Sequence, residues 1–206
     1  RITTENLELY NELEKGPDAF AMLSAHVGNY EMGGYTLVAK SKCIYMLVFG
    51  QETQTVMENR QEQFGKTNIR MVPVGNGMNH LFAINEALTT GQILSMTADR
   101  RFGSEKVVSC NFFGAEALFP MGPFATVIQR DVPTLVVLVV KTGTRSYHAV
   151  VKRLPMPEAH LPRKERIALL AQAYANELEN VVRQYPEQWF NFFNIWTTTT
   201  CQNPKQ

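Results

Sequence analysis

One apolar run, residues 134–140 (TLVVLVV), constrains the fold of this 206-residue chain more than any other feature. It is built from β-branched residues and leucines, and it lacks the polar alternation of a strand with one wet face. A strand of this kind is buried on both sides, as in a parallel or mixed sheet covered by helices. The run is also far shorter than the roughly 18 residues needed to cross a bilayer. It therefore predicts the centre of a soluble α/β domain.

Predicted strands alternate with predicted helices along the rest of the chain. Short apolar runs indicate further strands at residues 19–25, 43–49, 69–74, 92–97, 107–113 and 146–154. Helical spacing or polar, helix-prone composition indicates helices at residues 53–64, 78–88, 122–130 and 163–183. In the second of these, the expected buried face is formed by Leu81, Ile84, Ala87 and Leu88.

This order predicts a single α/β domain with a mixed, mainly parallel central sheet flanked by helices. We expect a helical lead-in at residues 1–18, the main domain at residues 19–196 and a tail at residues 197–206. The aromatic segment at residues 189–196 (WFNFFNIW) is expected to pack under the sheet rather than to touch a membrane interface.

Composition excludes several classes of protein. With 45% hydrophobic and 19% charged residues, the chain is neither disordered nor a polytopic membrane protein. The net charge of +1 gives no positive field for a nucleic-acid partner. Three cysteines without CxxC spacing argue against a disulfide framework or a zinc site, and favour a reducing compartment. The remaining histidines do not have the spacing of metal ligands: His80, His148 and His160.

The clearest chemical motif is the hexapeptide at residues 26–31 (HVGNYE), directly after a predicted strand. It places His26 five positions before Glu31. An imidazole removes a proton from a hydroxyl best when a carboxylate holds its other ring nitrogen, and Glu31 could do so. Gly28 would let the backbone approach a ligand, and Asn29 suits the N-cap of a helix carrying Glu31. From the spacing alone, a structural role for this pair is equally expected.

The hexapeptide resembles the His-x4-Asp/Glu box of the bacterial lipid A biosynthesis acyltransferases, the lauroyl and myristoyl transferases. These enzymes belong to the lysophospholipid and glycerolipid acyltransferase superfamily. Four further blocks follow in the order of that family: AINEALTTG, ILSMTADRRFG, FFGAEALFPMGPFATVIQRDVPTLVV and YPEQWFNFF. The resemblance covers residues 19–196, nearly the whole chain.

The resemblance implies how such an enzyme would act. His26 would be the general base, Glu31 its orienting partner, and Asp99 matches a position that the family requires. The donor would be an acyl-carrier-protein or CoA thioester, and the acceptor a hydroxyl of a lipid A precursor or similar lipid. No metal or other cofactor is implied. We expect peripheral contact with the cytoplasmic face of the inner membrane, or anchoring through a segment that this sequence lacks.

The sequence departs from the family next to Asp99. Many members have an Asp-Gln or Asp-x-Asp sequence there, whereas this chain has Arg100 and Arg101 after Asp99. The His-Arg-Arg sequence that usually follows the tail aromatics is also missing. Arginines at a strand end would suit phosphate on the acceptor or on a carrier arm. Equally, they could pair with Asp99 or face solvent. Arg60 and Arg70 are candidates for a further basic position of the family.

Three alternatives remain open. The acceptor could be a different one, such as a polyene pigment, an amino-acid lipid or a lysophospholipid. The chain could also be a non-catalytic lipid-binding domain with the same fold. A thioesterase or lipase is disfavoured, because no serine lies in a Gly-x-Ser-x-Gly elbow.

Overall fold

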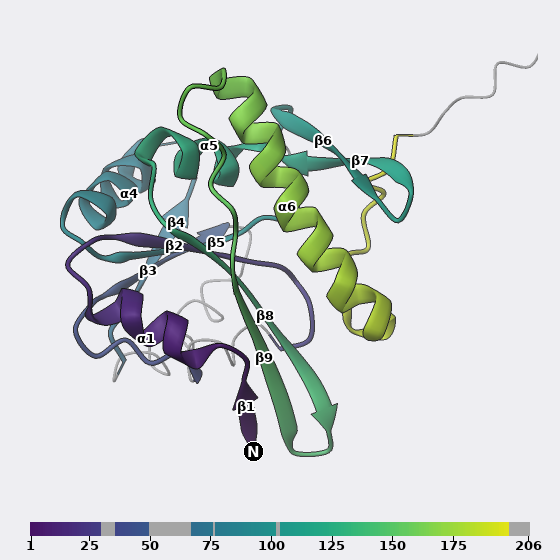
Figure 1. Ribbon diagram of the computed structural model, residues 1–206, viewed down its shortest axis with the longest axis horizontal. Helices are drawn as coiled ribbons and strands as arrows, with labels where there is room; N and C mark the ends of the chain where they lie inside the picture. Colours follow the sequence, from purple (N-terminus) through teal and green to yellow (C-terminus); the bar gives the residue numbers. More distant parts are fainter. Residues whose placement is uncertain (30–35, 50–66, 76, 102–103, 198–206) are drawn as a thin grey trace, which may run out of the picture.

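A computed structural model of the chain describes residues 1–29, 36–49, 67–75, 77–101 and 104–197. Its centre is a seven-stranded mixed sheet in the order β1-β9-β8-β2-β5-β3-β4, and a separate hairpin pairs β6 with β7 (Figure 1). Helices cover both faces of the sheet. The predicted fold class, an α/β domain with a mixed and mainly parallel sheet, is confirmed.

The strands and helices lie close to the predicted ranges. The strands are β1 Ile2–Thr4, β2 Phe20–Ser24, β3 Ile44–Phe49, β4 Ile69–Val74, β5 Ile93–Thr97, β6 Val107–Phe112, β7 Ala115–Pro120, β8 Thr134–Gly143 and β9 Ser146–Arg153. The helices are α1 Leu7–Lys15, α4 Asn79–Thr89, α5 Met121–Arg130 and α6 Arg163–Gln184, followed by the short 3-10 helix η1 Pro186–Gln188.

The two faces of the sheet carry two apolar clusters, because successive side chains of a strand point to opposite sides. In β2, Ala21 and Leu23 belong to the larger cluster, which includes residues of α4, α5 and α6. Phe20 and Met22 belong to the smaller one, together with Tyr10 of α1. Strand β8 divides in the same way, so the run at residues 134–140 is buried on both faces as predicted.

Strand direction brings a set of strand ends to one edge of the sheet. Strands β8, β2, β5, β3 and β4 are parallel, whereas β9 is antiparallel to β8. We call the edge at which the five parallel strands end the carboxyl edge. Ligands of α/β proteins bind outside this edge, where the chain turns to opposite sides of a strand. Here that place lies between β2 and β5, because the chain goes from β2 to β3 on one side and from β5 to β8 on the other.

The N-terminal residues contain more than the expected helix. Helix α1 is present at Leu7–Lys15, but Ile2–Thr4 also form strand β1, which pairs with β9 and so extends the main sheet. A three-residue strand is too short to show an alternating pattern, which is why the sequence did not predict it. Strand β7, which lies between the predicted strand at residues 107–113 and the predicted helix at residues 122–130, was not predicted either.

Helix α4 packs differently from the prediction. Its buried residues are Ala83 and Ala87, whereas Leu81 is 49% exposed. The two alanines let the helix backbone approach the sheet closely, so Leu81 lies outside the contact. Ile84 and Leu88 are partly buried against the core, as expected. The predicted helix at residues 53–64 lies outside the described residues.

Candidate active site

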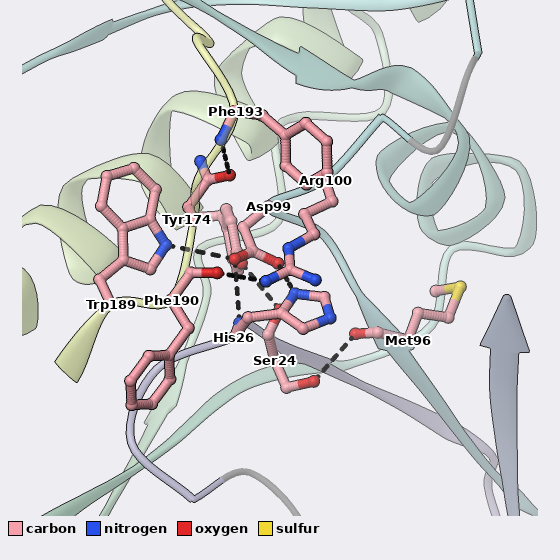
Figure 2. A network of polar contacts seen from close by, with 10 residues as sticks. Ser24, His26, Met96, Asp99, Arg100, Tyr174, Trp189, Phe190 and Phe193 are labelled. Carbon is pink, nitrogen blue, oxygen red and sulfur yellow. Dashed lines mark hydrogen bonds and ion pairs between the residues drawn. The ribbon is translucent and has the colours of Figure 1, made fainter. Parts of the chain in front are cut away.

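His26 lies two residues beyond the end of β2, and its partner Asp99 lies two residues beyond the end of β5. The Nδ1 atom of His26 is 2.7 Å from Oδ1 of Asp99 (Figure 2). The backbone N–H of His26 also donates to Oδ2 of Asp99 at 2.9 Å. Strands β2 and β5 are parallel neighbours, so their carboxyl ends bring together two residues that are 73 positions apart.

Asp99 is held by a set of donors in a dry environment. Its side chain has no exposed surface, and that of His26 is 12% exposed. In addition to the two contacts with His26, the carboxylate accepts a hydrogen bond from Nε1 of Trp189 at 3.2 Å. A buried carboxylate is stable only when it is hydrogen-bonded and paired in this way.

The contact with Asp99 decides which form of the imidazole is favoured. A carboxylate at Nδ1 accepts a hydrogen bond from a protonated Nδ1, which places the lone pair of the neutral ring on Nε2. The same carboxylate stabilises the imidazolium that forms when Nε2 takes up a proton. This is the arrangement required of a general base.

Tyr174 of α6 is buried next to the site (Figure 2). Its hydroxyl donates to the carbonyl of Ser24 at 2.8 Å, and so ties the long helix to the last residue of β2. Burial, followed by the negative charge of Asp99, raises the pKa of Tyr174 well above its usual value. The phenol therefore stays protonated and acts as a hydrogen-bond donor.

The backbone after His26 is fixed by a close approach to β8. Gly28 adopts a left-handed conformation with φ +58°, and a Cβ built on it would lie 2.1 Å from the carbonyl oxygen of Val139. The N–H of Asn29 donates to that same carbonyl at 3.0 Å, and the N–H of Gly28 donates to Gln188 at 2.7 Å. The close backbone approach expected of Gly28 is thus made to the sheet itself.

The C-terminal segment 189–196 lies against the site. The N–H of Phe190 donates to the carbonyl of His26 at 2.8 Å. The guanidinium of Arg100 donates to the carbonyl of Phe190 and lies 5.6 Å from the ring centre of Phe193 (Figure 2). The expected packing of this segment holds for Trp189 and Trp196, which pack against the larger cluster. It does not hold for the exposed rings of Phe190, Phe192 and Phe193.

The other predicted site residues are placed as follows. Glu31 and Arg60 lie outside the described residues. Arg70 pairs with Glu86 at 3.1 Å and with the hydroxyl of Tyr45, near the start of β4 and hence at the opposite edge of the sheet from His26. Arg101 is exposed beside the site. Asn29 contributes its backbone N–H to the loop after His26.

Two contacts of the site were not foreseen, those of His26 with Asp99 and of Asp99 with Trp189. The available signal was that His26 and Asp99 each follow a buried strand at the same distance. The order of strands along the chain does not reveal that β2 and β5 are neighbours, because β3 and β4 come between them in sequence.

A comparison with known protein families shows which family the chain belongs to. The model of the bacterial lipid A biosynthesis acyltransferases matches residues 1–198. The chain belongs to this family. The acyltransferase family match therefore extends over both β1 and the aromatic segment, and the expected family membership is confirmed. Among curated proteins, none matches this acyltransferase.

Family membership makes the chain an enzyme that transfers acyl groups in lipid A-type biosynthesis. None of the helices in the described ranges is long and apolar enough to span a bilayer. In the same ranges, no cluster of three or more His, Cys, Asp or Glu residues is arranged to hold a metal ion.

Proposed function

We propose that this acyltransferase moves a fatty acyl group from an acyl-carrier-protein or CoA thioester to a hydroxyl of a lipid A precursor or a similar lipid. In this proposal His26 is the general base. The observation that carries it is the 2.7 Å contact between Nδ1 of His26 and the buried carboxylate of Asp99, at the carboxyl edge of the sheet.

The proposed step balances without a further reactant. The acceptor hydroxyl gives its proton to Nε2 of His26 while its oxygen attacks the carbonyl carbon of the thioester. The C–S bond then breaks, and the imidazolium returns the proton to the leaving thiolate. Asp99 stabilises the imidazolium between these two proton transfers, which is the role that a buried aspartate has beside a catalytic histidine.

The role that the resemblance gives to Glu31, orienting the imidazole of His26, stays a proposal. The family motif aligns it with the acid of the His-x4-Asp/Glu box, whereas the described contacts at Nδ1 belong to Asp99. The two proposals for the carboxylate at Nδ1 can be separated, because only one acid can occupy that position. Replacing the acid at Nδ1 lowers kcat and shifts the pH profile of the reaction, whereas replacing the other changes mainly KM.

The two arginines after Asp99 have different proposed roles. Arg100 uses its guanidinium on the carbonyl of Phe190 and the ring of Phe193, so we assign it the positioning of segment 189–196 over the site. Arg101 is exposed next to it, and we assign it the contact with a phosphate of the acceptor or of the carrier arm. Arg60 is retained as a candidate for the same phosphate.

The test is acyl transfer from a panel of carrier-protein and CoA thioesters to lipid A precursors, lysophospholipids and other hydroxylated lipids. We expect His26→Ala to abolish the product with every acceptor. The matched control is His160→Ala, because that imidazole is exposed and pairs with Glu158 at the surface. Transfer that survives in His26→Ala, or its absence from the unaltered chain with every acceptor, would favour a non-catalytic lipid-binding domain.

A further inference from the structure

We infer that the carboxyl edge of the sheet is the face with which this enzyme docks on an anionic lipid bilayer. The aromatic segment 189–196 and the start of α4 would supply the inserting side chains, and nearby basic residues would contact the headgroups. The inference deepens the proposed function, on which it rests, by naming the surface that brings a lipid acceptor to His26.

The first observation is an exposed row of phenyl rings beside the catalytic residues. The side chains of Phe190, Phe192 and Phe193 are 43%, 85% and 63% exposed. They are not on a loosely attached tail, because Trp189 donates to Asp99 and Phe190 donates to the backbone of His26. Large exposed apolar groups next to each other mark a site of interaction. The backbone of the segment that carries these phenyl rings is thus held against the site by hydrogen bonds.

A second apolar group lies at the same edge. Helix α4 follows β4 and leads into the parallel strand β5, so it runs back across the sheet and begins at the carboxyl edge. Around its first turn, Met78, Leu81 and Phe82 are 62%, 49% and 68% exposed, and this turn contains no acidic residue. Two separate segments thus expose apolar side chains on either side of the strand ends.

Basic residues accompany the phenyl rings. Lys141 and Arg145 are exposed on the β8–β9 hairpin, which extends past the end of α6 (Figure 1). The side chain of Gln188 bonds the backbone of Lys141 in both directions, and so fixes this hairpin next to the aromatic segment. Arg101 is exposed after β5. In residues 101–106, 141–145 and 187–196, the exposed acids are Glu105 and Glu187, and the exposed basic residues outnumber them.

A bilayer fits this combination better than an acidic protein partner does. Phenyl groups with a basic surround are typical of segments that lie in a membrane interface, where the rings enter the acyl boundary and the cations meet the phosphates. With this face on the bilayer, a lipid hydroxyl can reach His26 without leaving the membrane surface.

The experiment is sedimentation of the chain with vesicles of phosphatidylcholine, with and without a minority of phosphatidylglycerol. We expect the double variant Phe192→Ser/Phe193→Ser to bind vesicles about tenfold or more weakly than the unaltered chain. Lys141→Gln/Arg145→Gln should lose mainly the gain from phosphatidylglycerol, about fivefold per removed charge. The control is Leu169→Ser, since Leu169 is 47% exposed but lies in the first part of α6, toward the other edge of the sheet.

Each outcome decides the inference, provided that thermal unfolding shows the variants to be folded. Vesicle binding that is absent in the unaltered chain, or that is the same in the phenyl variant, overturns it. So does a phenyl variant that binds vesicles normally but loses affinity for the acyl carrier protein. The His26→Ala variant separates the two proposals, because it should bind vesicles like the unaltered chain while making no product. If the enzyme transfers acyl groups to a micellar acceptor but binds no vesicles, the docking inference is wrong and the proposed function stands.

Discussion

At the scale of single residues, the site depends on groups that no local pattern connects. His26 and Asp99 are 73 positions apart, and the contact between them is created by the pairing of β2 with β5. The resemblance to a family marked both residues, but the spacing within residues 26–31 suggested Glu31 as the partner of the imidazole. Sequence spacing reports neighbours along the chain, whereas a sheet brings distant strand ends together.

Replacing Asp99 by asparagine tests its role at Nδ1. A carboxamide can keep the hydrogen bond from Trp189 but cannot stabilise an imidazolium, so we expect kcat to fall about a hundredfold to ten-thousandfold. The pH profile of the residual activity should change as well, because the partner of the base has lost its charge. Asp131→Asn is the control, since Asp131 is an exposed carboxylate that pairs with Arg166 away from the site. An Asp99→Asn enzyme with normal kcat would assign the imidazole to another acid.

Gly28 should tolerate no side chain. In Gly28→Ala the new Cβ would meet the Val139 carbonyl at 2.1 Å in addition to requiring a left-handed backbone. We expect a loss of about 3 kcal/mol or more in the free energy of unfolding. Gly114→Ala is the matched control, because Gly114 also has a positive φ but nothing lies within 4 Å of its added Cβ. That variant should cost only about 1 kcal/mol, so equal losses in the two melting curves would refute the steric argument.

At the scale of elements, sequence patterns predicted most strands and helices and missed those whose pattern is set by tertiary contacts. The seven-residue run of β8 and the long periodic helix α6 are local signals, and both are confirmed. Helix α4 illustrates the opposite case. Leucine and alanine are both apolar, and only the closeness of the sheet decides that Ala83 is buried while Leu81 is exposed.

The stability that comes from the contact between α1 and the loop at residues 40–42 should depend on pH in the acidic range. Burial alone would raise the pKa of Glu14, but hydrogen bonds from Ser41 and from the Lys40 N–H outweigh burial and lower it below its usual 4.5. Because the folded pKa is the lower one, Glu14 contributes stability above the unfolded pKa and loses it as the pH falls through the folded value.

Glu14→Gln should therefore flatten the dependence of stability on pH below about 4.5. The measurement is the free energy of unfolding by urea at a series of acidic pH values. The comparison is Glu8→Gln, which removes an exposed acid from the same helix. If both variants keep the slope of the unaltered chain, the hydrogen bonds of Glu14 carry no pH-dependent stability.

At the scale of the whole molecule, the expected lead-in at residues 1–18 contributes a strand to the central sheet and a ring to its smaller apolar cluster. Strand β1 pairs with β9, and Tyr10 of α1 packs with Phe20 of β2 at an edge-to-face distance of 6.0 Å. The segment before residue 19 is thus part of the same core as β2. The family match, which begins at residue 1, is consistent with this packing.

Unfolding should accordingly be a single transition. Tyr10→Ala removes a ring from the smaller cluster and Leu178→Ala removes a side chain from the larger one, on the opposite face of the sheet. Each should cost about 2–5 kcal/mol. Both tryptophans of the chain, Trp189 and Trp196, lie beside the site, so their fluorescence reports its integrity. If the lead-in and the main domain share one core, each variant should shift the fluorescence and far-ultraviolet transitions together. A Tyr10→Ala chain that loses helical signal first, with tryptophan fluorescence unchanged, would instead make residues 1–18 a separate unit.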